Sequence, residues 1–380
     1  MTRDHSTRDG DPLGRRGRDS GRPSPDEPAA PHSRDPAMPP AGGIGNARAA
    51  SARGAPVGGD TTASLLIVVL NYRTADLTIQ CLASLAPEVR AVPGARVIVA
   101  DNDSGDGSVT RIEQALLDFH WSSWARVVSL PRNGGFAWGN NRGIEAGGAA
   151  TYVLLLNSDT IVHSGCLSYC RCVMDADPTI GAMSCKLLDV DGTVQPIARR
   201  FPNPVRHMLC TTGLPWHFPR LFGWGQLEYR DWDAATQARD PDWLAGAFLF
   251  IRSDVMERLG GLDDSFFFYG EDVEFCHRVW RAGFRCRYDP GASITHLGGA
   301  SSDPSRMDSN LRSLHAWRGR YLVQRKCYGR PAEILTRAVD LAACAARVLW
   351  MRLTGRQHEP RYDDMRNALS ILTRRLDRTT

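Results

Sequence analysis

The sequence lacks a long apolar segment. Its longest stretch without a charged residue has 13 residues, whereas a helix needs about 20 apolar residues to cross a bilayer. The first 60 residues also lack the apolar core of a secretory signal peptide. We therefore expect a cytoplasmic protein that does not span a membrane.

Closely spaced cysteines are also scarce. The ten cysteines are scattered through 380 residues, whereas small secreted domains pack their cysteines densely to form disulfides. Reduced thiols are therefore expected. Cys166, Cys170 and Cys172 form a cluster, but this spacing is not typical of zinc sites, so a metal role there is disfavoured.

Strong net charge is absent, but the charge is uneven. The net charge of +4 divides into +1 for residues 1–60, −6 for 61–310 and +9 for 311–380. A general nucleic-acid binder carries its positive charge on the folded body. The acidic body therefore argues against nucleic acid as a partner.

Residues 1–62 are poor in core-forming side chains. The first 60 contain 9 Pro and 10 Gly and no aromatic residue. Such a segment cannot bury enough apolar surface to offset the entropy lost on ordering. We predict a disordered Pro/Gly/Arg-rich tail, with a docking role as the alternative.

Apolar runs that alternate with helical patterns begin at Leu65. The run Leu65–Leu70 is continuous, which is typical of a strand buried on both faces. The alternation predicts an α/β fold with a doubly wound, mostly parallel sheet and right-handed crossovers. Strands are expected at 65–70, 96–100, 125–130 and 152–156, and helices at 77–85 (with Pro87 after it), at 108–119 and from within 133–143.

Polar side chains follow all four of these strands. Asn71, Asp101, Asn133 and Asp159 stand at or just beyond the strand ends. In doubly wound sheets, ligands bind outside the carboxyl ends of the strands. We therefore expect these four side chains to border a ligand site.

The glycine patterns exclude two common phosphate sites. The sequence has no G-x-x-x-x-G-K-[ST] loop, and no G-x-G-x-x-G opens the first βα turn. A divalent cation on a carboxylate can hold a diphosphate instead, because Mg²⁺ and Mn²⁺ prefer oxygen ligands. Asp159 is suited to this task. His296 could add a nitrogen ligand, or could be structural.

A second pair of carboxylates, Glu271 and Asp272, opens a helix expected at 271–282. It follows the aromatic run Phe266–Tyr269. A carboxylate in apolar surroundings has a raised pKa and can serve as a general base. The alternative is a capping role at the helix N-terminus.

The second half of the chain has weaker patterns of apolar residues than the first. Strands are expected at 180–188, 243–251 and 284–297. Residues 199–235 are rich in aromatic side chains but interrupted by Pro and Gly, which predicts a long loop region. A loop of this length is often a lid or a binding loop, and a packed satellite subdomain is the alternative.

A helix is expected at 331–353 in the basic tail. Leu335, Leu349 and Leu353 fall on an apolar face, and Arg337 and Asp340 on a polar one. A basic amphipathic helix can lie on an anionic membrane surface. We expect such a peripheral contact, on the inner face of the plasma membrane. A helix docked on the body or a dimer contact is the alternative.

Seven short motifs together resemble the family 2 glycosyltransferases, and most closely their bacterial rhamnosyltransferase and galactofuranosyltransferase branch. They cover about 65–301. The motifs are Val68–Tyr72, Val99–Ser104, Asn133–Gly143, Leu155–Asp159, Trp243–Phe248, Gly270–Phe275 and His296–Ser301.

The resemblance implies a GT-A fold at 63–310, with a nucleotide-binding half at 63–160 and an acceptor-binding half at 161–310. The basic helical tail would occupy 311–380. It implies inverting transfer of a sugar, with L-rhamnose as first choice, from a nucleoside-diphosphate donor. The acceptor would be a cell-envelope glycan or a polyprenyl-linked glycan, as in cell-wall or surface-polysaccharide biosynthesis.

The resemblance also implies roles for single residues. Asp272 would be the general base, and Glu271 would contact the acceptor or the donor sugar. Asp159 and His296 would hold Mg²⁺ or Mn²⁺. Asp101 would bond the pyrimidine base. The residues implied for nucleotide and donor binding are Asn71, Tyr72, Asp101, Asn133, Gly134, Gly135, Asn140, Asn157, Trp243 and Gly246.

One position departs from the family pattern. Asn157 stands where the first Asp of a D-x-D triplet is expected, which leaves Asp159 as the one carboxylate there and predicts a modest metal affinity. A sugar nucleotidyltransferase is an alternative, but it would carry a basic glycine-rich loop near the first strand. An inactive sugar-binding protein is another, although Asp159 and Asp272 are both retained.

Overall fold

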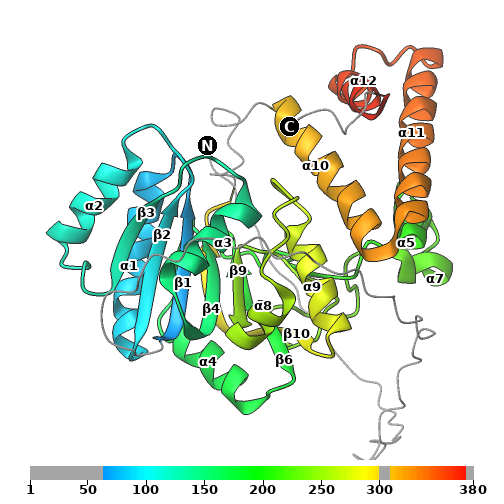
Figure 1. Ribbon diagram of the computed structural model, residues 1–380. Coiled ribbons are helices and arrows are strands. Elements are labelled where there is room, and N and C mark those ends of the chain that lie inside the picture. The colour runs from blue at the N-terminus through cyan, green and yellow to red at the C-terminus, as the bar shows by residue number, and fades with distance from the viewer. Residues whose placement is uncertain (1–62, 299–308, 374–380) are drawn as a thin grey trace, which may run out of the picture. The chain divides into compact units, whose positions relative to one another are not determined.

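Strands and helices alternate through the first half of the chain, as the apolar runs predicted (Figure 1). The computed structural model describes residues 63–298 and 309–373, so the predicted tail 1–62 lies outside the described residues. The elements of this half are β1 (Ala63–Asn71), α1 (Ala75–Ala91), β2 (Ala95–Asp101), α2 (Ser108–Asp118), β3 (Ala125–Ser129), α3 (Phe136–Gly147) and β4 (Ala150–Asn157).

The end of α1 was predicted wrongly. The helix continues through Pro87 to Ala91. Its last turn is held by a tertiary contact, because the buried Glu88 carboxylate accepts hydrogen bonds from the backbone N–H groups of Gly165 at 2.7 Å and Leu167 at 3.0 Å. These bonds satisfy N–H groups at the start of α4 (Cys166–Ala176).

The second half adds further strands to the same sheet. The strand predicted at 243–251 is two strands, because the backbone around Ala245 and Ala247 bonds to Ile197 and Asn157 instead of continuing one ladder. The elements are β5 (Thr160–Val162), β6 (Ile180–Leu188), β7 (Ala198–Arg199), β8 (Trp243–Leu244), β9 (Phe248–Arg252), α8 (Ser253–Leu259), α9 (Glu271–Arg281) and β10 (Arg285–His296).

The main sheet has the order β3-β2-β1-β4-β9-β6-β10-β5. Four pairs of neighbouring strands are parallel: β1 with β2, β1 with β4, β2 with β3, and β6 with β10. Strand β9 runs antiparallel to β4 and β6, and β5 runs antiparallel to β10. The predicted α/β class with a doubly wound, mostly parallel sheet is therefore confirmed.

The register brings the polar strand ends to one edge. Asn71 of β1 lies opposite Asp101 of β2, and Leu70 lies opposite Asn157 of β4. The chain leaves the sheet at this edge after each of the three strands, as expected. The order reverses between β1 and β4, and this reversal is where doubly wound sheets bind ligands.

A row of glycines lets α3 approach the sheet closely. A Cβ atom at Gly139, Gly143 or Gly147 would lie 2.4–2.5 Å from side chains of β1. The spacing of four residues places these glycines on one helix face. This close packing fixes the start of α3 at the ligand edge of the sheet.

Within the region 199–235, where a loop was predicted, residues 204–225 form short helices, and 226–235 contain no regular element. Asn203 caps the first of its helices, since its side-chain oxygen accepts a hydrogen bond from Arg206 N at 2.8 Å, and Pro204 occupies the first turn. These capping residues were the sequence signal. The elements are α5 (Pro204–Thr212), α6 (Leu214–His217), α7 (Pro219–Phe222) and the 3₁₀ turn η1 (Gly223–Gly225).

The tail contains the predicted helix and two more. α10 (Ser309–Val323) leads through the π-helical turn η2 (Gln324–Tyr328) into α11 (Arg330–Leu353), and α12 (Pro360–Thr373) follows. Among the helices at 63–298 and 309–373, none combines the length and apolar character needed to cross a membrane.

Candidate active site

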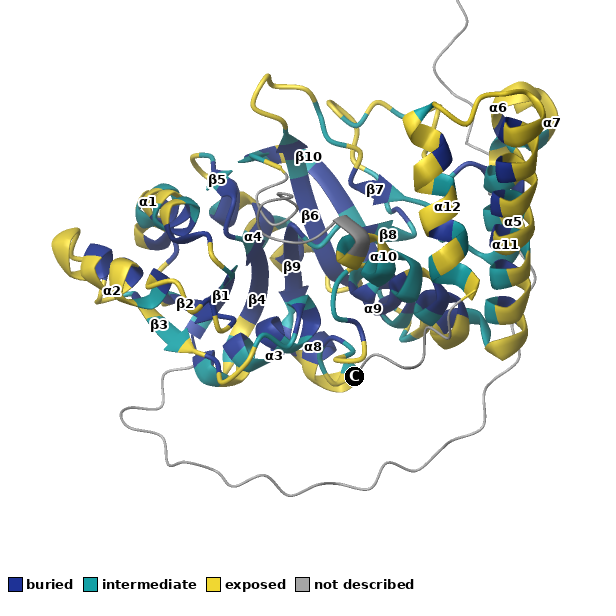
Figure 2. Ribbon diagram, turned by 90° about the horizontal axis from the view of Figure 1, so that it is seen from above, coloured by how far each residue is buried: buried dark blue, intermediate teal, exposed yellow. Residues whose placement is uncertain are grey.

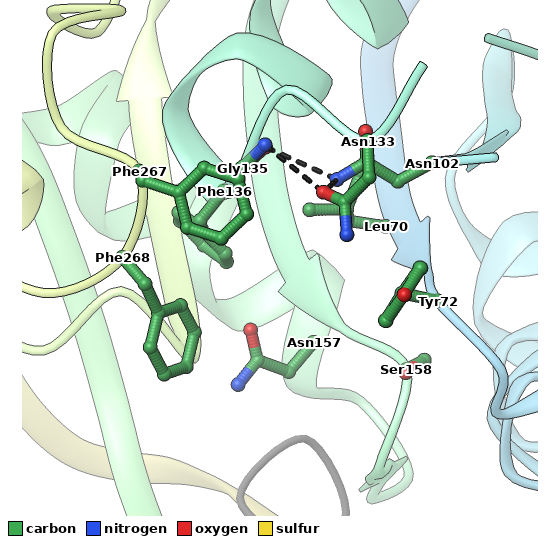
Figure 3. Close-up of a pocket in the computed structure, with 10 residues that line it drawn as sticks. All are labelled: Leu70, Tyr72, Asn102, Asn133, Gly135, Phe136, Asn157, Ser158, Phe267 and Phe268. Atoms are coloured by element: carbon green, nitrogen blue, oxygen red, sulfur yellow. Dashed lines mark hydrogen bonds between the residues drawn. The ribbon is translucent and has the colours of Figure 1, made fainter. Parts of the chain in front are cut away.

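A pocket of about 630 Å³, open to solvent, lies at the carboxyl edge of the sheet. Figure 3 shows the rings of Phe136, Phe267 and Phe268 on one side, and Tyr72 and Asn102 on the other. The complete lining is Leu70, Tyr72, Asn102, Asn133, Gly135, Phe136, Asn157, Ser158, Phe267 and Phe268.

Two amide side chains shape the loop that precedes α3. Asn102 donates to the side-chain oxygen of Asn133 at 2.9 Å and to the carbonyl of Gly135 at 3.2 Å, and it accepts from Gly134 N at 3.2 Å. The oxygen of Asn133 also accepts from Gly135 N at 3.1 Å. Figure 3 draws the bonds among Asn102, Asn133 and Gly135. These bonds fix the conformation of the loop beside the pocket.

Asn71 and Asp101 lie beneath this loop and are buried. Asn71 Nδ2 donates to Asp101 Oδ1 at 2.6 Å, and the hydroxyl and N–H of Ser104 donate to the two oxygens of Asp101 at 2.6 and 3.1 Å. Asp101 does not line the pocket, whereas its neighbour Asn102 does. Asp101 therefore orders the turn after β2.

The second carboxylate expected at this edge, Asp159, has a free oxygen. Its Oδ1 is buried and accepts no hydrogen bond from the residues that the structure describes. His296 Nε2 lies 3.3 Å from this oxygen and 3.4 Å from Asn157 Nδ2. Strand pairing brings them together, since His296 lies opposite Thr160 in the β10–β5 ladder.

The second ring nitrogen of His296 faces Asp159. His296 Nδ1 pairs with the side-chain oxygen of Gln195 at 2.9 Å, and Nε2 lies within hydrogen-bonding distance of Asn157 Nδ2 at 3.4 Å. A buried carboxylate oxygen that accepts no hydrogen bond, beside an imidazole nitrogen, fits a divalent cation. No group of three His, Cys, Asp or Glu side chains placed to hold a metal occurs in the described ranges, so further ligands would come from the diphosphate and water.

Asp272 lies at the opening turn of α9. Its Oδ2 accepts a hydrogen bond from Gly246 N at 3.2 Å, and its Oδ1 accepts from Val273 N at 2.8 Å. A Cβ atom at Gly246 would lie 3.5 Å from the ring of Phe136 and 3.7 Å from Cβ of Asp272. Gly246 thus joins the carboxylate to a wall of the pocket.

The neighbouring carboxylates have different surroundings. Burial, reinforced by the negative charge of Asp272, raises the pKa of Glu271 to about 8. Its Oε2 atom has no hydrogen-bond partner in the described part of the chain. Burial also raises the pKa of Asp272, and the two N–H donors counteract part of that rise. The pair can therefore hold one proton on Glu271 while Asp272 is ionised.

The predicted donor residues divide into two groups. Tyr72, Asn133, Gly135 and Asn157 line the pocket. The others lie in its supports: Gly134 in the loop before α3, and Asn140 in α3, where it donates to the carbonyl of Phe136 at 2.9 Å. Trp243 Nε1 donates to the carbonyl of Arg200 at 3.0 Å. The positions of Asn71, Asp101 and Gly246 are given above.

Six pocket residues were missed by sequence reasoning, namely Leu70, Asn102, Phe136, Ser158, Phe267 and Phe268. Asn102 follows Asp101 and was hidden by its charged neighbour, and Ser158 lies within the predicted triplet. Phe267 and Phe268 belong to the aromatic run before Glu271, which was the available signal. Their approach to the Gly135 loop depends on tertiary structure.

The comparison with family models gives a match over most of the chain. Residues 63–318 match the model described as "Glycosyltransferase like family 2". This range contains the pocket, Asp159, Asp272 and His296, so the family assignment covers the complete candidate site.

Curated relatives include two rhamnosyltransferases. The N-acetylglucosaminyl-diphospho-decaprenol L-rhamnosyltransferase of Mycobacterium tuberculosis is 29% identical over 211 residues, which are 53% of this chain and 66% of that protein. The chain thus covers slightly less than two thirds of this relative. The rhamnosyltransferase WbbL of Escherichia coli is 38% identical over 55 residues, 14% of this chain and 21% of that protein.

Among solved structures, the mannosyltransferase PcManGT of Pyrobaculum calidifontis, in complex with GDP-Man and Mn²⁺, aligns with a TM-score of 0.49 and 16% identity. The alignment covers 82% of this chain and 86% of that one. The family membership rests on the match over 63–318. The chain belongs to the glycosyltransferase-like family 2.

Proposed function

We propose that this chain is an inverting glycosyltransferase that moves a sugar from a nucleoside-diphosphate donor to an acceptor hydroxyl. The observation that carries the proposal is the position of Asp272, next to Gly246 and the Phe136 wall of the pocket. Family membership supports the reaction class. The pocket at the sheet edge would take the donor.

The reaction needs a general base for the acceptor hydroxyl and a positive charge to compensate the leaving diphosphate. Asp272, with its raised pKa, accepts the proton of the acceptor hydroxyl while that oxygen attacks the anomeric carbon. Glu271 holds its own proton, which keeps a second negative charge away from the attacking oxygen. A single displacement inverts the anomeric configuration. Mg²⁺ or Mn²⁺, when held by Asp159 and His296, would neutralise the leaving diphosphate.

The substrates in this proposal follow the activities of the relatives. L-rhamnose is the proposed donor sugar, and a polyprenyl-linked cell-envelope glycan is the proposed acceptor, because the mycobacterial relative is a rhamnosyltransferase for a decaprenyl diphosphate sugar. The enzyme would act in the cytoplasm, at the inner face of the plasma membrane. Three phenyl rings in the pocket suit a sugar that carries a methyl group.

A two-step experiment tests the proposal. Thermal unfolding with a panel of nucleoside-diphosphate sugars, with and without Mn²⁺, identifies the donor, since a ligand at 100 times its dissociation constant stabilises by about 2.7 kcal/mol. Donor turnover is then compared between the wild type and Asp272→Asn. Stabilisation without turnover would indicate a sugar-binding protein, and equal turnover by both chains would exclude Asp272 as the base.

A further inference from the structure

Exposed apolar side chains gather on two neighbouring segments. Of the 18 large apolar residues that are exposed in the described ranges, 12 lie at 205–224 or in α11, so their distribution is strongly uneven. We call these 12 residues the apolar face. Its members are Val205, Met208, Trp216, Phe218, Leu221 and Trp224 in the first segment, and Ile334, Leu335, Leu341, Leu349, Trp350 and Leu353 in α11.

The two segments are joined by side-chain contacts. His207 Nε2 lies 2.8 Å from Asp340 Oδ1, and Arg347 donates to the carbonyl of Thr211 at 3.1 Å. Both views place α5 and α7 beside α11, and Figure 2 colours much of α7 and α11 as exposed. The apolar face is therefore one surface built from two parts of the chain.

The orientation of α11 differs from that of an ordinary surface helix. Its polar residues Thr336 and Asp340 are buried, and Asp340 also accepts a hydrogen bond from the hydroxyl of Tyr321 at 3.0 Å. The sequence predicted Asp340 on the solvent side, and this was wrong, because the carboxylate pairs with α5 and α10. The helix also buries Ala332, Cys344, Val348 and Met351. A second set of apolar side chains, Ile334, Leu335, Leu341, Leu349, Trp350 and Leu353, stays exposed along its length.

The exposed charges on these segments have one sign. The sequence contains no Asp or Glu from Gly192 to Leu227. In α11, Glu333 and Asp340 are partly or fully buried, whereas the exposed charged residues are Arg330, Arg347 and Arg352. Arg347 and Arg352 donate to neutral oxygens, of Thr211 and Tyr362. A surface with exposed aromatic rings and unneutralised arginines complements an anionic bilayer.

We propose that the apolar face docks on an anionic lipid bilayer, with the turns 214–224 entering the interface beside α11. Tryptophan suits this position because its ring is apolar and its N–H is polar, and Trp216, Trp224 and Trp350 are each 51–54% exposed. The arginines favour lipid headgroups over a second copy of this cationic face. The proposal deepens the proposed function, since a lipid-linked acceptor lies in the bilayer.

Co-sedimentation of the full chain with vesicles tests the docking. The vesicles contain phosphatidylcholine alone, or phosphatidylcholine and phosphatidylglycerol in equal parts. The wild type should sediment with the anionic vesicles and less at high salt. A Trp216→Ser/Phe218→Ser/Trp224→Ser variant and a Leu349→Ser/Trp350→Ser/Leu353→Ser variant should each lose about tenfold or more in partitioning.

A matched control is Leu117→Ser/Phe119→Ser, which removes two side chains that are 62% and 58% exposed in and after α2. It should bind as the wild type does. The variant Arg347→Gln/Arg352→Gln keeps every apolar side chain of the face and should bind the anionic vesicles more weakly. It tests the docking even if an apolar variant fails to fold. The docking is wrong if the wild type stays in the supernatant, or if all variants sediment equally.

Light scattering and donor turnover separate the remaining outcomes. A dimer in solution that the apolar variants dissociate would assign the face to a second copy and overturn the proposal. Turnover is measured without vesicles on a water-soluble acceptor. Turnover without vesicle binding overturns the docking alone, and vesicle binding without turnover overturns the proposed function alone.

Discussion

Nε2 of His296 lies 3.3 Å from Oδ1 of Asp159, and that oxygen accepts no hydrogen bond within the described ranges. Leaving a buried carboxylate oxygen unpaired costs free energy unless a ligand completes the site. The pairing of β5 with β10 brings the two side chains together from positions 137 residues apart. Their closeness is the strongest sign of a cation site among the residues that the structure describes.

Asp159→Asn should therefore weaken Mn²⁺ binding by at least about tenfold, because it removes the single carboxylate of the triplet. Isothermal titration of Mn²⁺ in the presence of a nucleoside diphosphate measures the affinity. Asp191→Asn, which alters an exposed carboxylate, is the control and should bind as the wild type does. Unchanged affinity in Asp159→Asn would place the cation elsewhere.

Gln195→Leu should weaken the same binding without touching the cation. Gln195 accepts from His296 Nδ1 at 2.9 Å and donates to the carbonyl of His296 at 3.1 Å, so it fixes the ring and its tautomer. Loss of such a partner typically costs about 10–100-fold in metal affinity. Gln195→Glu retains an acceptor and should recover much of the loss. Equal affinities in all three chains would show that Gln195 does not orient the ring.

Gly135→Ala should disrupt the donor pocket. Gly135 has φ of 89°, and a Cβ atom there would lie 2.2 Å from the carbonyl oxygen of Phe267. Gly165→Ala is a matched control, because φ is 79° and nothing lies within 4 Å of the added atom. The control should lose about 1–2 kcal/mol of unfolding free energy.

Gly135→Ala should lose more than this control, and it should also bind the nucleoside diphosphate more weakly, because the clash displaces Phe267 from the pocket wall. Urea unfolding and calorimetry measure the two effects. If both variants lose the same stability and bind equally, the close approach of Gly135 to Phe267 does not shape the site.

Glu271→Gln should flatten the dependence of stability on pH. The pKa of Glu271 is raised from 4.5 to about 8 in the folded chain, so the folded state binds more protons than the unfolded state between these values. The free energy of unfolding contributed by Glu271 therefore falls as the pH rises from about 4.5 to about 8.

Urea unfolding at pH 5 and pH 9 measures this slope. The wild type should lose more stability than Glu271→Gln across the interval, and Glu257→Gln, at an exposed position, should follow the wild type. An identical loss in the wild type and Glu271→Gln would mean that Glu271 releases its proton at an ordinary pH.

The sequence predicted the part of the fold that depends on local pattern. The apolar run of β1 and the polar residue after each strand located the sheet and its ligand edge. Strand order could not be predicted from the sequence, because the apolar residues of β9 do not indicate that this strand lies antiparallel between β4 and β6. The helices at 204–222 were missed since Pro and Gly masked the cap at Asn203.

The sequence predicted those site residues whose charged or titratable side chains suggest a function. It did not predict those whose position depends on how the chain packs. Asp159 and His296 come together as expected. Asp101 carries the charge, but Asn71 and Ser104 occupy its oxygens, and the neutral Asn102 lines the pocket. For α11, the period of apolar residues predicted an amphipathic helix, but the partner of Asp340 decides which side faces out.

The central claim is that Asp272 takes the acceptor proton in an inverting transfer. The most direct measurement is the rate of sugar transfer by the wild type and Asp272→Asn, with the anomeric configuration of the product determined by NMR. The account predicts inverted product from the wild type and a loss of about 10²–10⁴-fold in rate for Asp272→Asn, with nucleoside diphosphate binding retained. Retention of configuration, or equal rates for the two chains, would contradict it.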